Sequence, residues 1–68
     1  MMKYGKILDF NGSSGRIIDE NGNKYILSYQ NILYENAKIG DLVKFKIETF
    51  KTPEIEEKIA TNIIKINN

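Results

Sequence analysis

The sequence has 68 residues, with ten Lys or Arg against nine Asp or Glu, and its formal net charge is +1. It contains neither cysteine nor histidine, which excludes disulfides, thiolate metal sites, most zinc sites and most nucleophile–base pairs. A chain of this length forms one domain, residues 1–68, and its near-neutral charge argues against strong non-specific binding of nucleic acid.

Three features of the sequence bear on its location. No apolar run is long enough for a transmembrane helix. The charged start of the chain is not followed by the apolar core of a signal peptide. The absence of cysteine fits a reducing compartment. We therefore expect a cytoplasmic protein that does not associate with membranes.

The first predicted strand covers residues 5–11 and has an irregular pattern. Strict alternation would place Asp9 on the same side as Ile7. A carboxylate does not belong in a core, so we predict a β-bulge or a sharp coil in this strand, and bulges are common at barrel corners. The strand ends in residues 11–15, where two glycines and three small polar residues indicate a turn.

The next two predicted strands, residues 16–19 and 24–29, form a hairpin. They are joined at Asn21-Gly22, and Asn-Gly is typical of a type I′ turn, in which both central residues have positive φ. Side chains alternate along the third strand. We expect its core face to carry Tyr25, Leu27 and Tyr29. The opposite face carries Lys24, Ile26 and Ser28.

Residues 30–40 are irregular, and we expect Ile32 and Leu33 to close one end of the fold there, in a single helical turn. Gly40-Asp41 marks a turn. Residues 42–48 then give the most regular alternation in the chain. Its apolar members, expected to point inward, are Val43, Phe45 and Ile47.

Residues 49–57 contain Pro53 and three glutamates, and we predict a solvated loop there. Residues 58–66 are rich in β-branched residues and form the last predicted strand. Five short strands in a chain this small favour a barrel, because closure removes the exposed edges that a small sheet cannot protect.

An ordered set of short motifs resembles the bacterial cold-shock domain. The start, Gly5-Lys6-Ile7 followed by Phe10-Asn11, is similar to the opening Gly-Lys-Val-Lys-Trp-Phe-Asn of that family. Residues 14–17 and 25–29 resemble its two ribonucleoprotein motifs. Residues 39–45 and 60–63 match its fourth and fifth strands. The resemblance spans nearly the whole chain and implies an all-β, five-stranded antiparallel barrel of the OB-fold type.

The resemblance also implies a function, which is the binding of single-stranded RNA or DNA by stacked aromatic side chains beside basic residues. The equivalent surface in this sequence consists of Lys6, Phe10, Asn11, Arg16, Ile26, Ser28 and Tyr29. Lys24 extends it, as part of a basic stripe with Lys6 and Arg16. The alternatives without a binding role are that these lysines only solubilise the surface, and that Phe10 and Tyr29 belong to the core.

The sequence departs from the family pattern at the positions that would contact bases. Asp9 stands where the family has tryptophan, Arg16 replaces a phenylalanine, and one Phe-Gly pair of the first motif is missing. Ile26 and Ser28 replace a stacking Phe and a His. We therefore expect weak nucleic-acid binding with little sequence preference, no enzymatic activity, no cofactor and no metal. The alternative is a protein-interaction module that has kept the barrel and lost the binding face.

Overall fold

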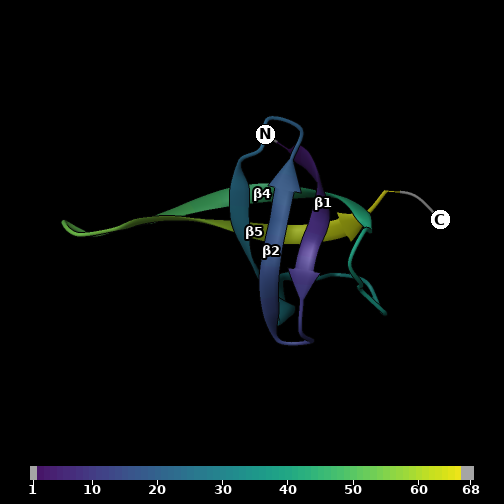
Figure 1. The fold of residues 1–68 in the computed structure, drawn as a ribbon. Helices are drawn as coiled ribbons and strands as arrows, with labels where there is room; N and C mark the ends of the chain where they lie inside the picture. The colour runs from purple at the N-terminus through teal and green to yellow at the C-terminus, as the bar shows by residue number, and fades with distance from the viewer. Residues whose placement is uncertain (1, 67–68) are drawn as a thin grey trace.

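The first three strands form an antiparallel meander joined by two short turns. In the computed structural model, which describes residues 2–66, β1 spans Lys3–Phe10, β2 spans Ser14–Asp19 and β3 spans Lys24–Ser28. Figure 1 shows β1 and β2 side by side, crossing the two later strands. The predicted turns lie where the glycines indicated them.

The second half of the chain closes this meander into a barrel. A single 3₁₀ turn at Tyr29–Asn31 follows β3, and an irregular connection leads to β4 at Leu42–Lys51 and β5 at Glu56–Lys65. The strand order around the closed barrel is β1-β2-β3-β5-β4 (Figure 1). The predicted all-β, five-stranded barrel of OB-fold type is therefore confirmed in its class and closure.

The predicted antiparallel pairing is wrong at one seam. β3 and β5 run parallel and pair at Ile26 and Ile59, whereas every other neighbouring pair of strands is antiparallel. The reason is one of parity. Direction reverses at each antiparallel step, so an odd number of strands cannot close a ring by antiparallel pairs alone. The barrel is therefore mixed.

The core is filled from all five strands. The rings of Tyr25 and Phe45 pack with centroids 5.2 Å apart and planes tilted by 59°. Fully or almost fully buried around them are Ile7, Ile17, Leu27, Val43, Ala60 and Ile63. The inward placement predicted for Tyr25, Leu27, Val43 and Phe45 is confirmed.

The predicted bulge in β1 is present. Ile7 pairs with Ile17, but the next matched pair is Asp9 with Arg16, so one extra residue of β1 is accommodated between them. Because of this shift, Asp9 leaves the core face and pairs with Arg16 on the outer face. The conflict seen in the sequence is resolved in the way that a bulge allows.

The β2–β3 hairpin forms at the predicted place with a different turn. Gly22 has a positive φ of 85°, whereas Asn21 does not share this conformation. The Gly22 N–H donates to the carbonyl of Asp19 at 3.1 Å, and the Asp19 N–H donates to the carbonyl of Asn23 at 2.9 Å. The type I′ geometry is therefore wrong, because one left-handed glycine is enough to close this longer turn.

The predicted loop over residues 49–57 is also wrong. β4 continues to Lys51 and β5 begins at Glu56, with Phe50 paired to Glu57 and Lys51 paired to Glu56. The resulting two-stranded arm, defined here as residues 48–58, extends far beyond the barrel (Figure 1). Because the sheet leaves the barrel at this point, Ile47 lies at the surface and not in the core as predicted.

Candidate nucleic-acid interface

The outer face of β1–β3 carries the predicted basic residues in register. Lys6 on β1 pairs with Ile18 on β2, and Ile18 pairs with Lys24 on β3. Both lysines are exposed and flank the half-buried isoleucine. Alternation places the three side chains on one face, because their neighbours Ile7, Ile17 and Tyr25 point into the core. This row therefore presents two positive charges to solvent.

A second row on the same face is centred on Arg16. Asp9 pairs with Arg16 across β1 and β2, and Arg16 pairs with Ile26 across β2 and β3. The Arg16 guanidinium donates from Nε at 3.1 Å and from Nη2 at 2.7 Å to the same oxygen, Asp9 Oδ2. This hydrogen bond, with the attraction between the charges, holds the pKa of Asp9 below its usual value and raises the pKa of Arg16. Both groups are therefore charged at neutral pH.

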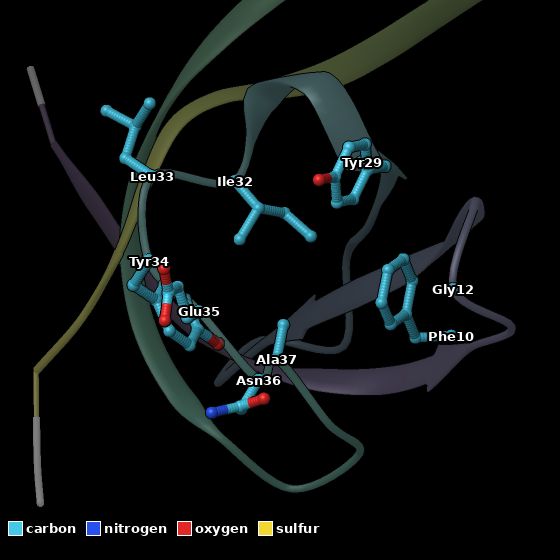
Figure 2. A pocket seen from close by; sticks show the side chains of 9 residues that line it. All are labelled: Phe10, Gly12, Tyr29, Ile32, Leu33, Tyr34, Glu35, Asn36 and Ala37. Carbon is cyan, nitrogen blue, oxygen red and sulfur yellow. The ribbon is translucent and has the colours of Figure 1, made fainter.

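Beside this face lies an open pocket of about 670 Å³. Figure 2 shows the rings of Phe10 and Tyr29 on one side of it, Ile32 beside Tyr29, and Tyr34 on the opposite side. The Tyr29 ring is 66% exposed, whereas Phe10 is half-buried and packs against the core. The pocket thus offers one accessible aromatic face and an apolar wall.

Hydrogen bonds hold the two elements that carry Phe10 and Tyr29 against each other. Asn11 Oδ1 accepts from the N–H groups of Ser13 and Ser14, each at 2.9 Å, which closes the β1–β2 turn. The Tyr29 N–H donates to the carbonyl of Ser13 at 2.9 Å, and the Ile32 N–H donates to the carbonyl of Tyr29 at 3.0 Å. The turn after Phe10 and the 3₁₀ turn that begins at Tyr29 are therefore held against each other.

The predicted surface is divided into two neighbouring parts. The outer face of β1–β3 carries Lys6, Arg16, Lys24, Ile26 and Ser28, whereas the pocket takes Phe10 and Tyr29. Tyr29 does not continue β3 as predicted, because the chain turns into the 3₁₀ helix at that residue. The Asn11 side chain accepts backbone hydrogen bonds within the β1–β2 turn. Alternation predicted the shared face of residues 24, 26 and 28, and the family resemblance added Lys6 and Arg16. The pocket, in contrast, depends on the irregular residues 29–41.

Two buried carboxylates were not predicted as organising groups. Asp19 is buried, accepts from the Tyr25 hydroxyl at 2.8 Å and lies 3.7 Å from Lys3 Nζ. Asp41 is also buried and accepts from the Tyr34 hydroxyl at 2.9 Å and from the Lys38 N–H at 3.0 Å. The signal available in the sequence was the aspartate at each turn, since Asp side chains accept hydrogen bonds from nearby backbone N–H groups there.

The second carboxylate fixes the far wall of the pocket. Burial alone would raise the pKa of Asp41, but hydrogen bonds from Lys38 and Tyr34 and the charge of Lys65, whose Nζ lies 3.7 Å away, lower it below the usual value. Burial is the main cause that raises the pKa of Tyr34, and the hydrogen bond to Asp41 raises it further. Tyr34 therefore keeps its proton and its place beside the pocket at neutral pH.

Searches of protein-family descriptions and of curated proteins find no match to this sequence. Within residues 2–66, no group of three or more Asp, Glu, His or Cys side chains is arranged to hold a metal ion. The same part of the chain has no helix that is long and apolar enough to cross a membrane.

Proposed function

We propose that this protein binds single-stranded RNA or DNA, weakly and with little sequence preference, on the outer face of β1–β3 and in the adjoining pocket. The observation that supports this best is the position of Phe10 and Tyr29. They come from different elements, line one pocket, and lie next to β2, the strand that carries Arg16. We also propose that the chain is a divergent cold-shock domain of the cytoplasm, which its barrel and its lack of cysteine support.

The proposed mechanism combines charge and stacking. Lys6, Arg16 and Lys24 pair with phosphates along the strand, while the exposed ring of Tyr29 stacks on a base. Stacking of this kind contributes about 1–3 kcal/mol per base and tolerates any base. Two full phosphate contacts from the lysines and a partial one from Arg16 predict that log K falls with log salt with a slope between about −1.4 and −2. Few contacts and little base readout together give weak binding without strong preference.

The experiment is a titration of the isotope-labelled protein with an oligothymidylate or oligouridylate of about ten nucleotides, at low and at moderate salt. We expect NMR shifts to gather at Lys6, Arg16, Lys24 and Tyr29, and to shrink as salt rises. The absence of shifts on this face at millimolar ligand in low salt would contradict the proposal.

Two variants separate the contributions of stacking and of charge to binding. Tyr29→Ala removes the accessible ring and should weaken binding about tenfold or more, with the salt slope unchanged. Lys24→Ala should flatten the slope by about 0.7. The matched control is Lys46→Ala, which removes the same charge from an exposed position on β4. Equal effects of the two lysine variants would show that only net charge matters.

A second candidate function is the binding of a partner protein through the arm. Phe50 is 51% exposed and Ile55 is 49% exposed, and both lie beyond the barrel. Exposed apolar side chains on a projecting ribbon are typical of interaction surfaces. A nuclease-treated pull-down should then recover a protein with the wild type and lose it with Phe50→Ser. Recovery of RNA alone from the untreated sample, and of no protein after nuclease treatment, would count against this function.

A further inference from the structure

We propose that Asp9 sets the affinity of the interface by occupying the Nε–Nη2 edge of Arg16 in the free protein, so that a nucleic-acid phosphate reaches this edge only by displacing Asp9. This inference rests on the proposed function, and it concerns how the affinity of the same site is regulated. Asp9 is thus an internal competitor: its carboxylate takes the position that a phosphate oxygen would take.

The geometry of the pair is that of an anion bound by arginine. Nε and Nη2 of Arg16 form the planar edge that binds carboxylate or phosphate, and both donate to Asp9 Oδ2 at 3.1 and 2.7 Å. Asp9 reaches this edge because the β1 bulge moves it from the core face to the partner position of Arg16. Without the bulge, the arginine would have no carboxylate opposite it.

The pair is accessible enough to be displaced. The side chains of Arg16 and Asp9 are 51% and 45% exposed, so solvent and ligand can reach both. Within residues 2–66, the hydrogen bonds and the ion pair of these two side chains run only between Arg16 and Asp9. The buried Asp19, in contrast, accepts four hydrogen bonds, from Asn21, Tyr25 and Asn23, and is fixed in place. Exposed ion pairs are weak, so a polyanion can replace Asp9.

Asp9 therefore has two effects on binding. It ties up the guanidinium, and its own negative charge lies at the position where a phosphate would approach. Both effects lower the affinity. A neutral amide at this position removes the negative charge and weakens the hydrogen bond to Arg16. The fold is expected to tolerate this change, because the pair lies at the surface and surface ion pairs add little to stability.

The test compares the wild type with Asp9→Asn in the titration with oligothymidylate of about ten nucleotides. We expect Asp9→Asn to bind about three- to tenfold more tightly at low salt, and the salt slope to steepen by about 0.7 because Arg16 becomes a full phosphate contact. The matched control is Glu54→Gln, which removes the same charge at the exposed tip of the arm and should change affinity less than twofold.

A second readout follows the arginine itself. The Nε–Hε resonance of Arg16 should shift in the free Asp9→Asn protein relative to wild type, and should move on oligonucleotide addition in both. Asp9→Ser, checked for a native spectrum, repeats the test without an amide. In the Arg16→Ala background, Asp9→Asn should tighten binding by less than it does in the wild type, since only the repulsion between Asp9 and phosphate is then left to remove.

The outcomes separate this inference from the proposed function. If the wild type binds and both folded Asp9 variants bind no more tightly, the competitor role is overturned while nucleic-acid binding stands. If Glu54→Gln tightens binding as much as Asp9→Asn, the effect is one of net charge and the role is also overturned. If neither the wild type nor the variants bind at millimolar ligand, the proposed function fails and this inference fails with it.

Discussion

The hydroxyl of Tyr25 donates a hydrogen bond to Oδ2 of Asp19 at 2.8 Å, beneath the β2–β3 turn. The same carboxylate accepts the N–H groups of Asn21 and Asn23 at 2.9 Å each. Burial alone would raise the pKa of Asp19, but these hydrogen bonds outweigh it and lower the pKa. A core tyrosine therefore anchors the turn that positions β3 and, with it, one side of the candidate interface.

This relationship predicts the effect of Tyr25→Phe. The ring remains to pack on Phe45, whereas Asp19 loses a donor in a buried setting. We expect the melting temperature to fall by on the order of 5 °C, measured by circular dichroism. Tyr4→Phe is the control, because Tyr4 is exposed on β1 and its loss of a hydroxyl should change the melting temperature by about 1 °C or less. Equal stability of Tyr25→Phe and wild type would contradict the anchoring role.

A second prediction concerns acid. The folded-state pKa values of Asp19 and Asp41 are both lowered, so each contributes stability above the unfolded pKa of about 3.9. That contribution is lost as the pH falls through the lower folded values. Urea unfolding should therefore show constant stability from about pH 7 to 5 and a fall below about pH 4.

A single variant tests the origin of this acid dependence. Asp41→Asn should be less stable than wild type at neutral pH, because Tyr34 and Lys38 lose a charged acceptor. Its stability should also decline less between neutral and acid pH. An unchanged decline in this variant would assign the acid dependence to other groups.

How far the sequence predicts this structure depends on how local each feature is. The hairpins followed from their glycines, the core from alternation, and the β1 bulge from the conflict at Asp9. The arm did not follow, because both of its faces are exposed and a polar sequence with Pro53 resembles a loop. The parallel seam at Ile26 and Ile59 follows from closing five strands and not from any local pattern.

The candidate site divides in the same way. The outer-face residues Lys6 and Arg16 were predicted from the family resemblance, and the face of Lys24 from strand alternation, which is local. The Asp9–Arg16 pair was not predicted, since it requires the register across two strands. The pocket at Phe10 and Tyr29 requires the fold of residues 29–41, for which the sequence has no periodic signal.

A third prediction addresses the close contact that fixes the β1–β2 register. A Cβ added to Gly15 would lie 2.0 Å from the carbonyl oxygen of Asp9 and 2.7 Å from its carbon. Gly15→Ala must therefore push the two backbones apart. We expect a loss of about 1–3 kcal/mol of unfolding free energy, or failure to fold, measured by urea denaturation.

The neighbouring Ser14→Ala is the matched control for Gly15→Ala. Ser14 lies on the same strand with an exposed side chain, so its truncation should cost less than about 0.5 kcal/mol. If Gly15→Ala were as stable as this control, the close approach of β1 and β2 would not be what holds Asp9 opposite Arg16.

The last prediction concerns the arm and its independence from the barrel. Residues 49–58 lie outside the core, and Glu48 pairs directly with Ile59 at the base of the arm. Replacing residues 49–58 with Asn-Gly should therefore close a short hairpin on an intact barrel. Unfolding free energy should change by less than about 1.5 kcal/mol, with any change favourable because the shorter loop costs less entropy.

The same variant separates the two candidate functions. Oligonucleotide binding at Tyr29 should persist, whereas any protein partner that is retained after nuclease treatment should be lost. A loss of more than about 2 kcal/mol would instead show that the arm helps to hold the barrel closed.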